Sequence, residues 1–171
     1  RSLAEGELVD ARSAYAAAGA TEKLIALGDR CVAVGRLDFA IHAYGDAGAT
    51  EKLIELGDRY FEVKEFGYAV RAYEEARATD KLLALGERYI AFGWLHYAQQ
   101  VFTLAGVPES LVACGDRCLA EELFDDAREA FVAAEATEKL VALGDQLLAK
   151  RQLDGARKAY AAAVRLGAAL E

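Results

Sequence analysis

Residues 49–59 read ATEKLIELGDR, and versions of this stretch occur five times along the chain. The other copies begin at residues 20, 78, 107 and 136, so each starts 29 residues after the one before. The spacing never changes, and therefore one glycine and one leucine hold a fixed place in every copy (Gly28, Gly57, Gly86, Gly115 and Gly144; Leu24, Leu53, Leu82, Leu111 and Leu140). A constant period of roughly 20–50 residues indicates a stack of small structural repeats, which typically present a surface to a partner rather than hold a catalytic site.

Each repeat carries the pattern of two helices. Apolar residues at spacings of three, four and seven predict a first helix over about residues 21–34 and a second helix over about residues 36–47 of the repeat that begins at residue 20. The chain is expected to form one domain, residues 1–171, with a leading half-repeat (4–19), five repeats (20–48, 49–77, 78–106, 107–135 and 136–164) and a tail (165–171). Because the chain does not begin with methionine, it is also consistent with a piece of a longer protein.

Helix ends are marked by short polar residues and glycine. Threonine begins the first helix in four repeats, and we expect it to be the N-cap residue; proline takes the same place in the other repeat (Thr21, Thr50, Thr79, Thr137; Pro108). Gly35 and Gly93 separate the two helices of a repeat, but Lys64, Glu122 and Arg151 occupy that position elsewhere, so glycine is favoured there and not required. Gly19, Gly48 and Gly106 are expected to end second helices in the left-handed conformation.

Two columns of the second helix predict how the layers pack. One is alanine in every repeat, which permits close approach of two helices, and the other is a large ring (Ala11, Ala40, Ala69, Ala98, Ala127, Ala156; Tyr15, Tyr44, Tyr73, Phe102, Phe131, Tyr160). We expect the rings to fill the space between layers. One repeat buries too little apolar surface to fold alone, so stacking must supply the remaining stability.

The bulk composition excludes several classes of function. A net charge of −8 argues against nucleic-acid binding, which needs clustered Lys and Arg, and against attraction to anionic membranes. No apolar run is long enough to span a bilayer, and the N-terminus lacks the order of a signal peptide. Three cysteines without a disulfide-framework spacing fit a reducing compartment, so a cytoplasmic location is expected.

The columns resemble the tetratricopeptide family, whose pattern includes Leu-Gly-x-x-Tyr on the first helix and Ala-x-x-x-Phe on the second. Here Leu56-Gly57-Asp58-Arg59-Tyr60 precedes Ala69 and Tyr73, and Leu85-Gly86-Glu87-Arg88-Tyr89 precedes Ala98 and Phe102. The repeat is 29 residues rather than the family's 34, and it lacks the family's tryptophan and closing proline, so a shortened second helix is expected. The resemblance implies an all-α, right-handed α-solenoid of antiparallel helix pairs, with eleven helices.

The resemblance also implies that the first helices line a concave groove. We define the first acidic row as Glu22, Glu51, Asp80, Glu109 and Glu138, and the second acidic row as Asp29, Asp58, Glu87, Asp116 and Asp145. The aliphatic row between them is Ile25, Ile54, Leu83, Val112 and Val141, with Val32, Phe61, Ile90, Leu119 and Leu148 one turn further on. These positions are the expected partner-binding residues.

Catalytic, metal and cofactor sites are not expected. Cys114 and Cys118 are four residues apart but lie in core columns, and neither His42 nor His96 lies in a position to complete a zinc site with them. Ser2, Ser13 and Ser110 do not follow a nucleophile elbow, and no glycine-rich phosphate loop precedes a helix. The sequence therefore does not indicate an enzyme.

Two interpretations of the acidic rows remain open. In one, the groove binds a basic or amphipathic protein or peptide; in the other, lysines and arginines of neighbouring repeats neutralise the acids, and the array is a structural or self-assembling spacer. End-to-end self-association is a further expectation because the chain ends show no polar capping helix. Phe39, Tyr68 and Tyr97 share a column near Trp94 and form either a second contact patch or rings packed over the turn between the two helices of the neighbouring repeat.

Overall fold

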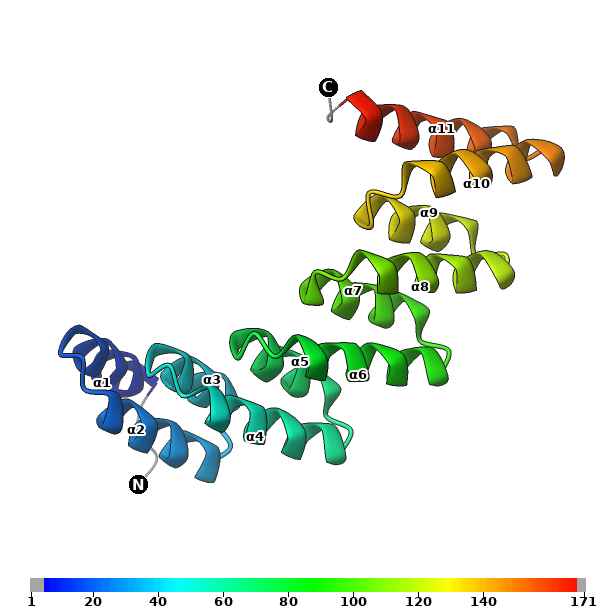
Figure 1. Ribbon diagram of the computed structural model, residues 1–171. Coiled ribbons are helices and arrows are strands. Elements are labelled where there is room, and N and C mark those ends of the chain that lie inside the picture. Colours follow the sequence, from blue (N-terminus) through cyan, green and yellow to red (C-terminus); the bar gives the residue numbers. More distant parts are fainter. Residues whose placement is uncertain (1–4, 169–171) are drawn as a thin grey trace. The chain divides into compact units, whose positions relative to one another are not determined.

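The computed structural model describes residues 5–168 of the 171-residue chain, and this part folds into helices without strands. The helices are α1 (Glu5–Ala17), α2 (Thr21–Ala33), α3 (Leu37–Asp46), α4 (Thr50–Glu62), α5 (Phe66–Glu75), α6 (Thr79–Ala91), α7 (Leu95–Ala105), α8 (Pro108–Ala120), α9 (Phe124–Ala133), α10 (Thr137–Ala149) and α11 (Leu153–Ala168). Figure 1 shows them as antiparallel pairs joined by short turns. The all-α helical repeat expected from the sequence is confirmed.

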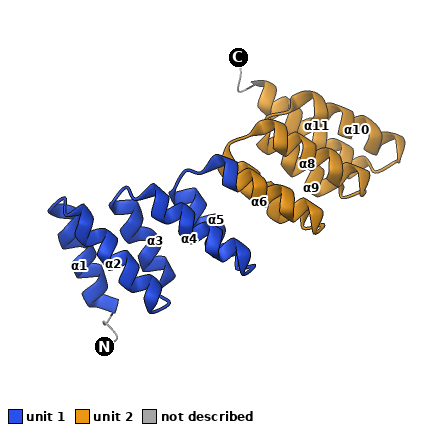
Figure 2. Cartoon of the chain, turned by 60° about the horizontal axis from the view of Figure 1, so that its bottom comes forward, with its two compact units in different colours: residues 1–81 blue, residues 82–171 orange. Residues whose placement is uncertain are grey.

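The chain divides into two compact units, residues 1–81 (unit 1) and 82–171 (unit 2), and the boundary falls inside α6 (Figure 2). In unit 1, α2 packs on α3 and α4 on α5, while α3 contacts both α4 and α5. In unit 2, α8 packs on α9 and α10 on α11, and α9 contacts both helices of the last pair. Each unit is therefore built by stacking one helix pair on the next.

The core of each repeat combines small residues with one large ring. The alanine column is fully buried at Ala40, Ala69, Ala98 and Ala127, and the ring column is buried at Tyr44 and in the three repeats that follow it. Leu53 and Leu56 of α4 belong to the same apolar cluster as Tyr44 of α3. The first helix of one repeat thus packs against the ring of the preceding repeat, which is how stacking stabilises repeats that cannot fold singly.

The turns between helices share one backbone feature, a residue with positive φ. At the end of α1, Gly19 has a φ of +61° and Ala20 N–H donates to Tyr15 O at 2.9 Å, as in a Schellman motif. Lys64, Arg77, Glu122, Glu135 and Arg151 adopt the same positive φ in other turns. This confirms that glycine is favoured at these positions without being required.

Two expectations about helix ends are wrong. Thr21, Thr50 and Thr137 are the first helical residues, and the N-cap residues are Ala20, Ala49 and Ala136, which make no side-chain capping bond. The reason is a backbone inverse γ-turn: Ala20 has φ −85° and ψ 66°, and Thr21 N–H donates to Gly19 O at 3.0 Å.

The last helix is also longer than expected, because α11 continues past Arg165 to Ala168. Val164 occupies the place of Gly48 and Gly106, and a β-branched residue disfavours the left-handed conformation that ends the other second helices.

Candidate interaction surface

The first acidic row is solvent-exposed on the first turns of α2, α4, α6, α8 and α10. A carboxylate at this place interacts favourably with the positive end of the helix dipole. Within residues 5–168, none of these five side chains forms an ion pair or a side-chain hydrogen bond. The first acidic row is therefore open to a partner in both units.

The second acidic row is largely occupied by contacts between repeats. The Tyr44 hydroxyl donates to Asp29 Oδ1 at 2.7 Å, and Lys52 Nζ of the next repeat lies 3.2 Å from the same oxygen. These hydrogen bonds, that of Tyr44 first, lower the pKa of Asp29. Burial and the neighbouring Asp29 carboxylate raise the pKa of Tyr44. The aspartate, ring and lysine form a triad that joins two repeats.

The same triad recurs 29 residues later. Asp58 Oδ1 accepts hydrogen bonds from the Tyr73 hydroxyl and from Lys81 Nζ, both at 2.7 Å. Burial alone would raise the pKa of Asp58, but the hydrogen bonds from Lys81 and Tyr73 outweigh it and lower the pKa. In unit 2, Lys139 Nζ lies 2.7 Å from both oxygens of Asp116, although the ring there is Phe131.

At the junction of the third and fourth repeats, other residues occupy all three positions of the triad. Glu87 stands in place of the aspartate, Phe102 has no hydroxyl, and Ser110 replaces the lysine. Across the described residues of unit 2, Glu87 has no cationic or hydrogen-bonding side-chain partner, and it is solvent-exposed. Glu87 is therefore an uncompensated carboxylate in a row whose other members have partners.

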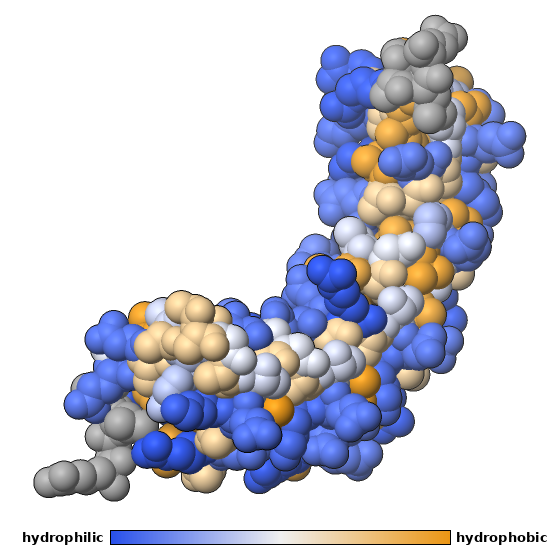
Figure 3. All heavy atoms as spheres, turned by 60° about the vertical axis from the view of Figure 1, so that its left-hand side comes forward, coloured by the Kyte–Doolittle hydropathy of each residue, from blue (hydrophilic) through white to orange (hydrophobic). Residues whose placement is uncertain are grey.

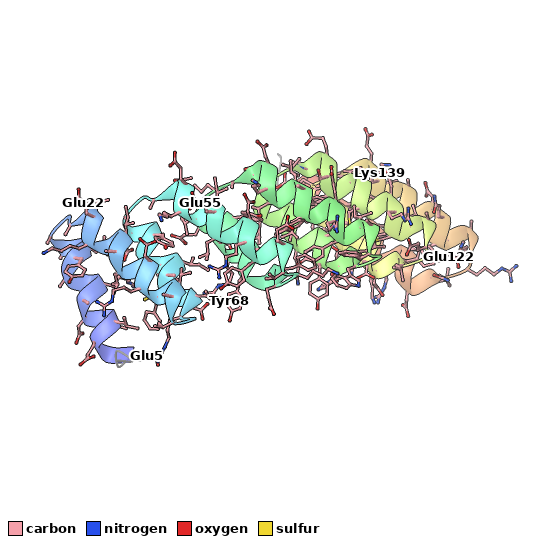
Figure 4. All side chains as sticks on the ribbon, turned by 90° about the horizontal axis from the view of Figure 1, so that it is seen from below. Glu5, Glu22, Glu55, Tyr68, Glu122 and Lys139 are labelled. Carbon is pink, nitrogen blue, oxygen red and sulfur yellow. The ribbon has the colours of Figure 1, made fainter. Side chains whose placement is uncertain are left out.

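The side chains of the aliphatic row are half-buried from Ile25 to Val112. Val141 and Leu148 of α10 are more open, at 40% and 50% exposure. Val32 belongs to a hollow of about 210 Å³ in unit 1, which is also lined by Asp29, Tyr44, Lys52, Glu55, Leu56 and Arg59. Figure 4 shows Glu22 and Glu55 on one side of unit 1 and Tyr68 on the opposite side, so the first and second helices present different faces.

The second contact patch has a different character in each unit. In unit 1, Phe39 and Tyr68 are half-buried, and Tyr68 packs on Tyr60 with ring centroids 5.6 Å apart. In unit 2, Phe92, Trp94 and Tyr97 are 41%, 46% and 56% exposed. Trp94 and Tyr97 pack on the buried ring of Tyr89, and Phe92 packs on Trp94. Tyr68 and Tyr97 thus pack on rings of their own repeat and not, as expected, over the turn of the neighbouring repeat, and the rings of unit 2 also face solvent.

The cysteines are buried core residues. Burial raises the pKa of the Cys31 and Cys114 thiols and raises the pKa of the Cys118 thiol to about 12, so all three are poor nucleophiles and poor metal ligands. In the described part of the chain, no group of three or more His, Cys, Asp and Glu side chains is placed to hold a metal ion. None of the helices there is long and apolar enough to cross a membrane.

Two contacts were missed at the level of sequence. The first is the tyrosine hydroxyl bond that completes the triad, since the sequence had indicated only that neighbouring lysines could neutralise the acids; its signal is that Glu87, Phe102 and Ser110 depart from their columns together. The second is a close approach of glycine to ring: a Cβ on Gly28 would lie 2.4 Å from Cε1 of Tyr44. The constant separation of 16 residues between the glycine and ring columns is the signal that would have found it.

The helix pairs and their recurring contacts define an all-α helical repeat protein. A comparison of the chain with protein-family models found no match, and a comparison with curated proteins found none either. The tetratricopeptide resemblance therefore stays a prediction that rests on the sequence motifs.

Proposed function

We propose that this protein is a protein-interaction module whose first-helix face binds a basic or amphipathic peptide. The observation that supports it best is Glu87, the member of the second acidic row that lacks both a hydroxyl donor and a lysine. A cationic side chain from a partner would take the place that Lys52, Lys81 and Lys139 occupy at the other triads.

The surroundings of Glu87 suit an amphipathic ligand. Leu83 and Ile90 of the same helix and Val112 of α8 are half-buried, so each leaves part of its apolar surface accessible. Glu109 of the first acidic row adds an exposed carboxylate on α8. Apolar residues of a peptide would cover the aliphatic side chains and fix its orientation, while the carboxylates would accelerate encounter with a cationic partner.

The alternative is a structural spacer that binds no peptide. It is favoured by Asp29, Asp58 and Asp116, which are neutralised by lysines of the next repeat and so serve the stacking of the repeats. The two functions differ in what they predict when Glu87 is neutralised. A binding module would lose affinity for a basic peptide, whereas a spacer binds no peptide and would show no such loss.

The test is a titration of the protein with Lys- and Arg-rich amphipathic peptides at about 50 mM and about 300 mM salt. We expect binding that weakens with salt and weakens again in a Ser110→Lys variant, whose new lysine would neutralise Glu87 from within. Ser13→Lys is the matched control, since it adds the same charge at an exposed position of α1, and it should bind the peptides as the unmodified protein does.

Equal affinity of the unmodified protein and the Ser110→Lys variant would refute a role for Glu87. Absence of binding by every peptide in the panel would favour the spacer. A Glu87→Lys, Asp58→Lys double variant provides a second test of the proposal. It should lose salt-sensitive peptide binding while it retains its helical circular dichroism.

A further inference from the structure

The outer face of the last helix pair carries exposed apolar side chains. Leu148, Leu153 and Val164 are 50%, 66% and 70% exposed. They border an open hollow of about 620 Å³, which is also lined by Ala156, Arg157, Tyr160, Ala161 and Arg165. In Figure 1 no described helix covers the outer side of α11, and in Figure 3 apolar side chains flanked by polar ones run through unit 2 toward its C-terminal end.

The equivalent face is covered in earlier repeats. The leucine counterparts of Leu153 are Leu8, Leu37 and Leu95, which are 3%, 8% and 4% exposed, and its other counterparts, Phe66 and Phe124, are half-buried. The next first helix lies over this face: Cys114 of α8 donates its thiol hydrogen to Leu95 O at 3.6 Å, and Leu53 and Leu56 of α4 share a core cluster with Tyr44. The chain itself therefore shows which kind of element fits here.

The carboxylate on this face is also complementary to a first helix, which carries a lysine at the matching position. The Tyr160 hydroxyl donates to Asp145 Oδ1 at 2.6 Å, which repeats the first half of the triad. Within residues 5–168, no lysine completes it. At the preceding repeat junction, Lys139 bonds to Asp116 and its Nζ lies 6.0 Å from the centre of the Phe131 ring.

We propose that the face formed by α10 and α11 is a docking site for one amphipathic helix of a partner protein that carries the pattern Lys-Leu-x-x-Leu. The lysine of that helix bonds to Asp145 beside Tyr160, as Lys139 bonds to Asp116 beside Phe131. Its two leucines enter the hollow bordered by Leu148 and Leu153, as Leu53 and Leu56 enter the preceding core.

A second copy of this chain has no such helix to offer. The leucines of that pattern in its own first helices, Leu24, Leu53, Leu82, Leu111 and Leu140, are at most 3% exposed because each is already packed inside its own unit. A copy would have to unstack a repeat to donate one. A second copy is therefore a poor donor of the docking helix.

The test is binding of a fluorescent peptide with the sequence of residues 136–150 to the full chain. Because an isolated helix of this length is marginal in water, the peptide carries a side-chain lactam between Glu138 and an Ala142→Lys substitution, two positions exposed in the chain. We expect saturable binding, and a loss of about tenfold or more in affinity for the Leu153→Lys protein. Leu104→Lys is the matched control, because Leu104 is a 45% exposed leucine of α7 away from this face, and it should leave the affinity unchanged.

An exchange of charge between the protein and the peptide distinguishes the proposed docking geometry from nonspecific hydrophobic binding. Asp145→Lys should weaken binding of the peptide, and a peptide with Lys139→Glu should bind that variant better than it binds the unmodified protein. Equal affinity in all four combinations, or no binding by the unmodified chain, would overturn the proposal. A concentration-dependent dimer that Leu153→Lys dissociates, and with which the peptide does not compete, would show that a second copy covers the face instead.

Discussion

A Cβ atom built on Gly57 would lie 2.4 Å from Cε1 of Tyr73, far inside van der Waals contact. The glycine and ring columns repeat this approach in every full repeat, from Gly28 with Tyr44 to Gly144 with Tyr160. We expect Gly57→Ala to destabilise the protein by about 1–3 kcal/mol, because the buried ring must shift. Denaturant unfolding checks this.

Gly67 is the matched control for that change. It lies in α5 and has open space around its Cβ direction, so Gly67→Ala should be neutral or stabilise by up to about 1 kcal/mol through helix propensity. If both variants had the same stability, close packing against the ring would not explain the glycine column.

The Asp58 triad predicts a loss of stability in acid. The pKa of Asp58 is lowered in the folded state, so the unfolded chain binds its proton more readily and the stabilisation disappears as the pH falls through and below the ordinary value of 3.8. We expect Asp58→Asn to cost about 0.5–1 kcal/mol near neutral pH, since the pair is partly solvent-screened, and less at about pH 3. Unfolding curves at the two pH values measure the difference, and an equal cost at both would contradict it.

Completing the triad in the third repeat should stabilise unit 2. Glu87→Asp, Phe102→Tyr and Ser110→Lys together supply the three groups that Asp58, Tyr73 and Lys81 provide, and we expect a gain of about 1 kcal/mol. The control is the same variant with asparagine at position 87, which keeps the shapes and removes the charge. A gain of the same size in the control would mean that the ion pair contributes nothing.

The turn residue Glu135 predicts a second gain in stability. It adopts a φ of +53°, a conformation that costs an L side chain roughly 1 kcal/mol. Glu135→Gly should therefore stabilise the protein by up to about 0.5–1 kcal/mol, reduced by the greater freedom of glycine in the unfolded chain. The reverse substitution, Gly48→Ala at a φ of +63°, should destabilise, and thermal unfolding of the two variants should shift in opposite directions.

The buried thiols predict slow chemical modification. Burial raises the pKa of Cys118 to about 12, so very little thiolate is present near neutral pH and a reagent cannot reach it in the folded protein. We expect labelling by a thiol reagent to follow global unfolding, with all three cysteines reacting together once denaturant is added. Rapid labelling of Cys118 in the native protein would show that unit 2 opens locally.

The fold follows from the sequence because the pattern is repeated. A single amphipathic segment leaves its boundaries ambiguous, but aligned copies average out local exceptions, and the helix predicted over residues 21–34 is found at Thr21–Ala33. The error at Thr21 arose because the γ-turn makes Ala20 the N-cap residue, and the Ala20 carbonyl accepts the Lys23 N–H that the Thr21 side chain was expected to bind. The end of the last helix was predicted too early, because Val164 stands in place of the glycine that ends other second helices and α11 continues to Ala168.

The candidate surface was harder to predict, because it depends on which side chains of successive repeats meet. The sequence placed Asp29 and Lys52 in separate columns, and only the packing of α4 beside α2 and α3 shows that they pair. The same packing divides the acidic residues into an open first row and a second row with internal partners. That division is invisible in any repeat considered alone.

The lysines that neutralise Asp29, Asp58 and Asp116 each belong to the repeat that follows the aspartate, and this gives the repeats an order. If residues 49–77 were deleted, Asp29 would meet Lys81 and the junction would keep its ion pair. If residues 78–106 were deleted instead, Asp58 would meet Ser110 and the junction would lose it. Gain or loss of whole repeats during evolution is thus tolerated unequally along the chain. The fourth repeat carries Ser110 in the lysine column, so it can follow another repeat without loss of an ion pair only if the second-row acid of that repeat has no lysine partner.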